Sequence, residues 1–263
     1  PLQPKPELLP KYQQKAQGAL HDNAIMATMI QAVDDGIGRI LAALRETDQE
    51  DNTIILFYSD NGGYGPATDM DPLWGYKGNY YEGGIRVPFF VHWPGVVAPG
   101  ETAEPIIGVD LYPTLLELAG AARPKQQPLD GVSLVPLCKG DVKTLGERSL
   151  FWHFPAYLQS YKVTHEQRDP LFRTRPVSVI RNGRYKLHEH LEDGALELFD
   201  LQTDVRERRN LADSQPAKRD ALLAELRAWR RAIGAPVPEQ SASFDAKAHE
   251  RALQNRARRA KQR

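Results

Sequence analysis

The sequence predicts an α/β fold followed by a small α+β subdomain. A stretch with helical periodicity over residues 23–45 is followed, after a polar turn at residues 48–52, by an apolar, β-branched stretch over residues 53–58. Further along, several short strand-like runs separated by turn residues precede a second helical pattern over residues 216–233. A helix followed in the sequence by a buried strand is typical of α/β layers, whereas several strands followed by a helix indicate a separate α+β unit.

The first helix is expected because its apolar side chains recur at steps of three and four residues. They are Met26, Met29, Ile30, Val33, Ile37, Ile40, Leu41 and Leu44. Residues 53–58 are continuously apolar or β-branched, which predicts a strand buried on both faces. Residues 64–84 are rich in Gly, Tyr and Trp without periodicity and predict a long ordered loop, and residues 87–93 predict a second strand.

A short helix is expected after Asp110, its N-cap, with Gly120 just past its end. Residues 124–148, rich in Pro, Lys, Gly and Leu, predict a wrapping connection that is neither helix nor sheet. We place a subdomain boundary there, which divides the chain into residues 1–148, 149–240 and 241–263.

The second subdomain is expected to be a meander of about four antiparallel strands covered by one helix. Strand patterns lie at residues 149–154, 177–181, 184–190 and 196–201, and Asn182-Gly183 is a strong hairpin signal. Pro216 is expected to open the covering helix. The last 17 residues carry seven Lys or Arg and one Glu, which indicates a solvated basic tail, with contact to an anionic polymer as the alternative.

Composition excludes several classes of protein. The 34 basic and 34 acidic residues balance, so net charge gives no sign of a nucleic-acid partner, and the single cysteine, Cys138, rules out an intrachain disulfide. No apolar run approaches the ~20 residues of a membrane span. The chain begins Pro-Leu-Gln without a signal peptide, and we expect residues upstream of Pro1. The sequence predicts no oligomeric state.

Candidate site residues follow the first strand. Asp60 and Asn61 offer adjacent carboxylate and amide oxygens, which suit Ca²⁺ or Mg²⁺. Two donors do not complete such a site, and Asp-Asn-Gly is also a common turn. Lys77, followed by Gly78, could pair with a sulfate or phosphate oxygen, although an exposed loop lysine is the simpler interpretation. Glu82 and Arg86 are expected to form a structural ion pair.

An ordered series of segments resembles the C-terminal half of a type I sulfatase. The resemblance covers about residues 1–235 and implies an alkaline-phosphatase-like mixed-sheet fold. It is carried by Thr53-Ile-Ile-Leu-Phe-Tyr-Ser-Asp-Asn-Gly-Gly63, Lys77-Gly78, Tyr81-Glu-Gly-Gly-Ile-Arg-Val-Pro88, Val109-Asp-Leu-Tyr-Pro-Thr114, Leu129-Asp-Gly-Val-Ser-Leu134, Phe151-Trp-His-Phe-Pro155 and Glu197-Leu-Phe-Asp-Leu201.

The resemblance implies hydrolysis of sulfate esters of a small molecule or polysaccharide. It makes Asp60 and Asn61 ligands of one Ca²⁺ and Lys77 a sulfate-binding residue. The family's nucleophile, a formylglycine made from Cys or Ser in Cys/Ser-x-Pro-x-Arg, has no match in this chain; the nearest run, Ser214-Gln-Pro-Ala-Lys218, ends in Lys. We therefore expect a truncated sulfatase, inactive alone, from a periplasmic or secreted protein.

Two other functions stay open. A phosphatase or phosphodiesterase of the same superfamily would typically have His rather than Asn61, because imidazole suits a zinc pair. A non-catalytic relative could instead bind carbohydrate by stacking sugars on aromatic side chains, which are Trp74, Tyr76, Tyr80 and Tyr81. His153 is a further candidate for substrate contact, although a hydrogen-bonded, partly buried histidine is the favoured interpretation.

Overall fold

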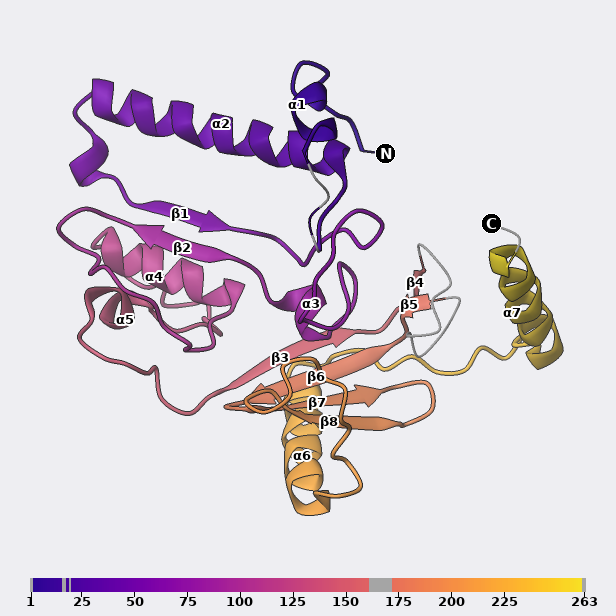
Figure 1. Ribbon diagram of the computed structural model, residues 1–263. Coiled ribbons are helices and arrows are strands. Elements are labelled where there is room, and N and C mark those ends of the chain that lie inside the picture. Colours follow the sequence, from indigo (N-terminus) through magenta and orange to yellow (C-terminus); the bar gives the residue numbers. More distant parts are fainter. Residues whose placement is uncertain (1, 16–17, 19, 161–171, 262–263) are drawn as a thin grey trace.

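The computed structural model describes residues 2–15, 18, 20–160 and 172–261 (Figure 1). Its helices are α1 (Leu9–Gln13), α2 (Ala24–Glu46), α3 (Glu82–Ile85), α4 (Leu111–Leu118), α5 (Val135–Lys139), α6 (Pro216–Ala232) and α7 (Ala246–Lys261). Its strands are β1 (Ile55–Tyr58), β2 (Phe89–His92), β3 (Ser149–Phe154), β4 (Leu158–Gln159), β5 (Phe172–Thr174), β6 (Val177–Asn182), β7 (Tyr185–His190) and β8 (Leu196–Asp200).

The first helix and the two following strands form where the sequence predicts them. The Asn23 side chain accepts a hydrogen bond from the Met26 N–H, 2.9 Å away, and so caps α2. β1 pairs antiparallel with β2, with Ile55 opposite His92 and Tyr58 opposite Phe89. The prediction that residues 53–58 are buried on both faces is wrong, because Phe57 and Tyr58 expose 37% and 42% of their surface.

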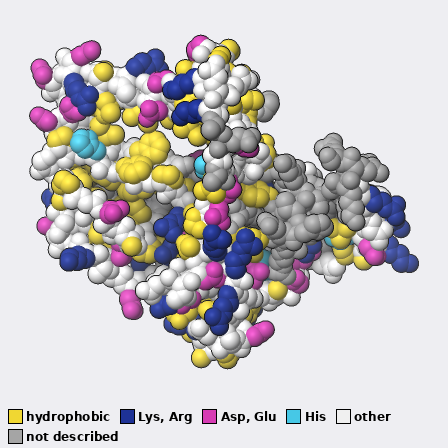
Figure 2. All heavy atoms as spheres, in the orientation of Figure 1, with side chains coloured by type: hydrophobic (Ala, Val, Ile, Leu, Met, Phe, Trp, Pro, Cys, Tyr) yellow, Lys and Arg dark blue, Asp and Glu magenta, His cyan; other side chains and the backbone are white. Residues whose placement is uncertain are grey.

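Part of the apolar side of α2 is also uncovered. Ile30, Val33 and Ile40 each expose more than half of their surface, at 59%, 58% and 62%. Figure 2 shows hydrophobic side chains gathered beneath α2, at the level of β1. Figure 1 places α2 over β1 and β2. Met26, Met29, Ile37, Leu41 and Leu44 are half-buried, so the apolar side that the pattern predicts is covered in part and exposed at the other three positions.

Two expectations for residues 110–148 need correction. Asp110 stands at the start of α4 but does not cap it: its carboxylate accepts hydrogen bonds from the backbone N–H groups of Ile107 and Val132 and pairs with Arg148 at 2.7 Å. Its partners come from the adjoining loops, which no local pattern reveals. The connection over residues 124–148 also contains a helix, α5, which Pro136 helps to start and Gly140, with φ of +78°, ends.

The C-terminal part contains a four-stranded antiparallel sheet in the order β3-β6-β7-β8, and α6 covers one of its faces, as predicted (Figure 1). The core lies between them and includes Ile180, Leu187, Leu198, Leu222 and Leu226. Trp229 of α6 stacks on Phe151 of β3 with ring centroids 4.6 Å apart. The segment predicted as a basic tail contains α7. No helix among the described residues is long and apolar enough to cross a membrane.

Candidate functional site

The turn after β1 is held by backbone contacts with the α3 region. The Gly62 N–H donates to the Gly84 carbonyl at 2.9 Å, and the Ser59 hydroxyl donates to the Asn61 carbonyl at 3.0 Å. A Cβ on Gly62 would lie only 1.8 Å from the Gly83 carbonyl oxygen. This close approach requires glycine and fixes the position of Asp60 and Asn61 relative to α3.

Lys77 is brought to the same turn. Its backbone N–H donates to the Gly63 carbonyl at 2.9 Å, although the two residues are separated by a loop of 13 residues. The structure thus groups the backbone of three of the four predicted site residues, Asp60, Asn61 and Lys77, at the end of β1. Asp60 and Lys77 are exposed, and neither side chain has an ion-pair partner within the described part of the chain.

The donor set at this turn fits a hard cation. The Asp60 carboxylate and the Asn61 amide present oxygen atoms that are not engaged in hydrogen bonds with other described residues. Ca²⁺ prefers such ligands but takes six to eight oxygens, so further donors are required. The residues present can therefore form one part of a Ca²⁺ or Mg²⁺ site, next to an ammonium group that can bind an anion.

His153 occupies a different setting on β3. Its Nε2 lies 2.8 Å from the Pro236 carbonyl oxygen, which can only accept, so Nε2 carries the proton. Its Nδ1 lies 2.9 Å from the Ser178 hydroxyl. Both ring nitrogens are thus engaged by protein groups. This arrangement is the hydrogen-bonded, partly buried histidine favoured by the sequence.

A buried charge network anchors α3 to the C-terminal sheet. Glu82 opens α3, and its carboxylate lies 3.0 Å from the Lys186 ammonium of β7 and 4.0 Å from the Arg86 guanidinium. Glu207 lies 2.9 Å from the same ammonium and accepts a hydrogen bond from the Glu82 N–H at 2.6 Å. The expected pairing of Glu82 with Arg86 is present, but Lys186 is the closer partner.

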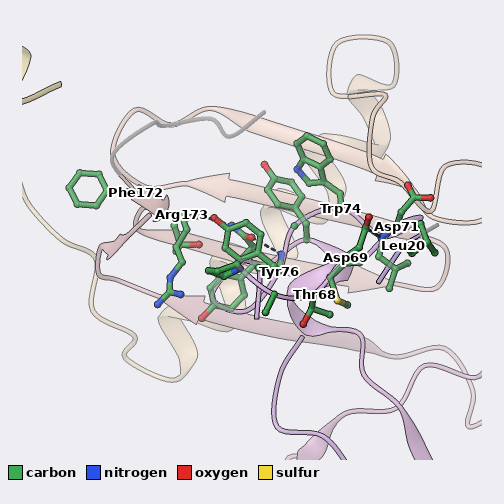
Figure 3. Close-up of a pocket in the computed structure, with 18 of the residues that line it drawn as sticks. Leu20, Thr68, Asp69, Asp71, Trp74, Tyr76, Phe172 and Arg173 are labelled. Atoms are coloured by element: carbon green, nitrogen blue, oxygen red, sulfur yellow. Dashed lines mark hydrogen bonds between the residues drawn. The ribbon is translucent and has the colours of Figure 1, made fainter. Parts of the chain in front are cut away.

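A pocket of about 630 Å³ lies between the loop after β1 and the C-terminal sheet (Figure 3). Its wall includes all four aromatic residues considered for sugar stacking, which are Trp74, Tyr76, Tyr80 and Tyr81. The guanidinium of Arg208 lies 3.7 Å from the centre of the Trp74 ring. Arg173 and the loop aspartates Asp69 and Asp71 add charged groups of both signs to the wall.

Two histidines of β7 and one glutamate of β8 meet at the edge of this pocket. His190 Nε2 and the Tyr81 hydroxyl lie 3.0 and 2.7 Å from the same carboxylate oxygen of Glu197. Burial alone would raise the pKa of Glu197, but the hydrogen bond from His190 and the neighbouring imidazole of His188 lower it to about 2. Burial lowers the pKa of His188, whose ring stacks on Tyr81 with centroids 4.8 Å apart.

The sequence pattern did not predict this second group of polar residues. Lys186, Glu207, His188 and Glu197 become neighbours of Tyr81 and Glu82 only through tertiary packing. The available signal was the alternation Lys186-Leu-His-Glu-His190, which places three polar side chains on one face of a strand.

Two family models match the chain in overlapping ranges. The model described as "Sulfatase" matches residues 4–121, and the model described as "N-sulphoglucosamine sulphohydrolase, C-terminal" matches residues 73–230. A sulfatase from Formosa agariphila is 35% identical over 258 residues, which is 89% of this chain but 44% of that protein. The chain therefore spans less than half the length of this relative.

Solved structures of similar fold also extend beyond the matched region. The crystal structure of Ps i-CgsB in complex with k-i-k-neocarrahexaose has a TM-score of 0.70 at 30% identity, covering 87% of this chain and 47% of that one. The structure of BT4656 in complex with D-glucosamine-2-N,6-O-disulfate has a TM-score of 0.62 at 25% identity, covering 88% and 43%.

Proposed function

Because this chain belongs to the sulfatase family, we propose that it forms the C-terminal part of the active site of a sulfuric ester hydrolase. The observation that carries this proposal is the convergence of Asp60, Asn61 and Lys77 on one turn, joined by the hydrogen bond from Lys77 to Gly63. The fold is the corresponding part of an alkaline-phosphatase-like α/β domain with a small α+β subdomain.

Each residue has a distinct role in the proposed reaction. The Lys77 ammonium binds a sulfate oxygen and offsets the charge that builds up as the ester bond breaks. Asp60 and Asn61 supply two oxygen ligands of a Ca²⁺, with Mg²⁺ as the alternative. When bound, that cation would polarise the sulfate group. The formylglycine nucleophile would come from residues that these 263 do not include.

The uncovered apolar surface supports the need for such additional residues. The exposed sides of α2 and of β1–β2 carry Ile30, Val33, Ile40, Phe57 and Phe90. Exposed apolar surface of this extent marks packing or interaction sites. We propose that the rest of a sulfatase catalytic domain covers it and completes the active site.

The proposed substrates are sulfate esters of carbohydrates, in a periplasmic or secreted setting. Support comes from the sulfated sugar named in the BT4656 structure and the neocarrahexaose named in that of Ps i-CgsB. The aromatic pocket favours a second candidate function, in which the chain only binds such sugars through Trp74, Tyr76 and Tyr80.

A chimera tests the catalytic proposal. This chain would replace the matching C-terminal part of the Formosa agariphila sulfatase, in a host that forms formylglycine. We expect hydrolysis of 4-nitrophenyl sulfate in preference to 4-nitrophenyl phosphate. Lys77→Ala should lower kcat/KM at least ~100-fold, as for loss of one charge-stabilising group, whereas the exposed-lysine control Lys139→Ala should not change it.

Three outcomes would contradict or redirect the proposal. Turnover that survives both Lys77→Ala and Asp60→Ala would reject the site. Preference for the phosphate ester would favour the phosphatase alternative. A folded chimera that binds sulfated oligosaccharide without any turnover would favour the carbohydrate-binding function.

A further inference from the structure

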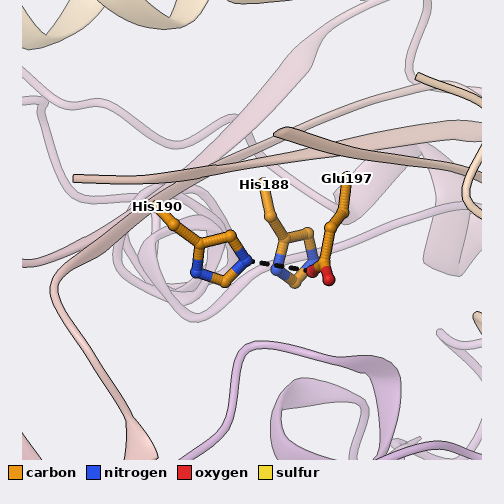
Figure 4. A group of neighbouring side chains, drawn as sticks. All are labelled: His188, His190 and Glu197. Carbon is orange, nitrogen blue, oxygen red and sulfur yellow. Dashed lines mark hydrogen bonds and ion pairs between the residues drawn. The ribbon is translucent and has the colours of Figure 1, made fainter. Parts of the chain in front are cut away.

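His188, His190 and Glu197 form a compact group of potential metal ligands outside the Asp60–Asn61 turn (Figure 4). His188 and His190 alternate along β7 and therefore lie on the same face of the sheet. Glu197 of β8 is directly opposite His188 in the strand register. One ligand atom from each side chain lies within 4.8 Å of the other two.

The spacing within the group is close to that of ligands sharing one metal ion. His190 Nε2 and Glu197 Oε2 are 3.0 Å apart. Two donors bound tetrahedrally to one Zn²⁺ at ~2.1 Å lie roughly 3.4 Å apart. Small side-chain shifts would therefore bring these atoms onto a common ion, and the paired strands hold their backbones in place.

The donor chemistry favours a transition metal over Ca²⁺. Two imidazoles and one carboxylate form a set that suits Zn²⁺ and related ions, whereas Ca²⁺ requires an all-oxygen environment. This separates the group from the oxygen donors Asp60 and Asn61. Three protein ligands also leave a fourth coordination position for water or another ligand.

The surroundings of the group suit a metal site that exchanges its fourth ligand. His188 and His190 are 1% and 8% exposed, yet both line the 630 Å³ pocket. The Tyr81 hydroxyl donates to Glu197 at 2.7 Å, which orients the carboxylate in the manner of an outer-shell partner. The His188 Nε2 is buried and makes no hydrogen bond within the described residues, and the Glu207 carboxylate, itself paired with Lys186, lies 3.8 Å from it.

We propose that His188, His190 and Glu197 bind one divalent transition-metal ion, with Zn²⁺ as the best match, at the wall of this pocket. The ion would join β7 to β8, and Tyr81 would contact it only through its hydrogen bond to Glu197. This site is independent of the proposed sulfatase activity, because none of its ligands belongs to the Asp60, Asn61 and Lys77 group.

Calorimetric titration of the chain with ZnCl₂ tests the site. We expect one Zn²⁺ per chain, and the same stoichiometry in the double variant Asp60→Ala, Asn61→Ala. His190→Gln and Glu197→Gln should each weaken binding at least ~10-fold. His92→Gln is the matched control, since His92 is an exposed histidine on β2, and it should bind as the unaltered chain does.

The metal site can also be tested on the unaltered chain, so that the test does not depend on whether the variants fold. With ¹⁵N-labelled histidine, NMR should show Zn²⁺ shifting the side-chain resonances of two of the seven histidines. Circular dichroism would confirm that each variant is folded. Absence of Zn²⁺ binding, shifts spread over exposed histidines, or folded His190→Gln and Glu197→Gln variants that bind normally would each overturn the proposal.

Discussion

The Lys186 ammonium of β7 lies 3.0 Å from the Glu82 carboxylate of α3, and both side chains are almost completely buried. Glu207 lies 2.9 Å from the same ammonium, while Arg181 and Arg86 approach Glu82 at 3.8 and 4.0 Å. The negative charges of Glu82 and Glu207 are thus balanced by nearby cationic side chains. Since Gly84 of α3 accepts the hydrogen bond from Gly62, this network links the C-terminal sheet to the turn that carries Asp60 and Asn61.

Replacing Lys186 by methionine should destabilise the chain strongly. The substitution keeps much of the side-chain volume but leaves Glu82 and Glu207 buried without their shared cation. Breaking such a pair costs about 3–5 kcal/mol in the free energy of unfolding. Urea unfolding measures the loss, and Lys143→Met, at an exposed position, is the control. Equal midpoints for Lys186→Met and the unaltered chain would contradict the role assigned to this network.

Asp110 should make the stability of the chain sensitive to acid. Burial alone would raise the pKa of Asp110, but the hydrogen bonds from Arg148, Ile107 and Val132 hold it below the ordinary value of 3.8. The pKa of Asp110 is lower in the folded chain than in the unfolded chain. The ionised carboxylate therefore contributes fully to the free energy of unfolding above pH 3.8, and this contribution declines as the pH falls below that value.

The variant Asp110→Asn isolates that contribution. We expect a loss of about 3 kcal/mol at pH 6, since Arg148 loses its buried partner. Urea unfolding at a series of pH values should show the difference between the variant and the unaltered chain shrinking below pH 3.8. A difference that stays constant over this range would show that the carboxylate charge is not what stabilises the fold here.

Gly62→Ala should disrupt the candidate site through its backbone. The new Cβ would meet the Gly83 carbonyl at 1.8 Å, and backbone on both sides leaves no side chain free to move away. We expect a loss of stability of about 3 kcal/mol or more. Gly100→Ala is the matched control, because a Cβ there has no neighbour within 4 Å. Thermal unfolding of both variants measures the difference, and similar melting temperatures would contradict the close approach.

Local pattern was sufficient for most of the secondary structure. The helical spacing that includes Ile30 and Ile40 predicted α2, and Asn182-Gly183 predicted the turn between β6 and β7; the structure contains both. The α/β class predicted from these patterns is confirmed by the similar solved structures, and the family predicted from the resemblance is confirmed by the matched family models. The subdomain limits at residues 148 and 240 and the roles of the site residues stay predictions.

Contacts between segments that are distant in the sequence could not be predicted from local sequence patterns. Phe57 was expected inside the molecule because an apolar strand is usually covered, but coverage depends on neighbouring layers. Asp110 was expected to cap its own helix, although the partners of its carboxylate are two loop N–H groups and Arg148. The grouping of His188 with Tyr81 likewise arises from packing between α3 and β7, which local periodicity does not encode.

Substitution of His153 tests whether this residue has a structural role or a substrate-binding role. Its ring joins Ser178 to the Pro236 carbonyl, and Arg230 donates to the same Ser178 hydroxyl at 2.9 Å. His153→Phe removes both hydrogen bonds and should lower the free energy of unfolding by about 1–3 kcal/mol. Binding of a sulfated oligosaccharide should stay unchanged, whereas Lys77→Ala should weaken binding without affecting stability, because its exposed side chain supports no internal contact. Calorimetry and urea unfolding on both variants provide the comparison. A His153→Phe chain of normal stability and weakened binding would instead make His153 a substrate-binding residue.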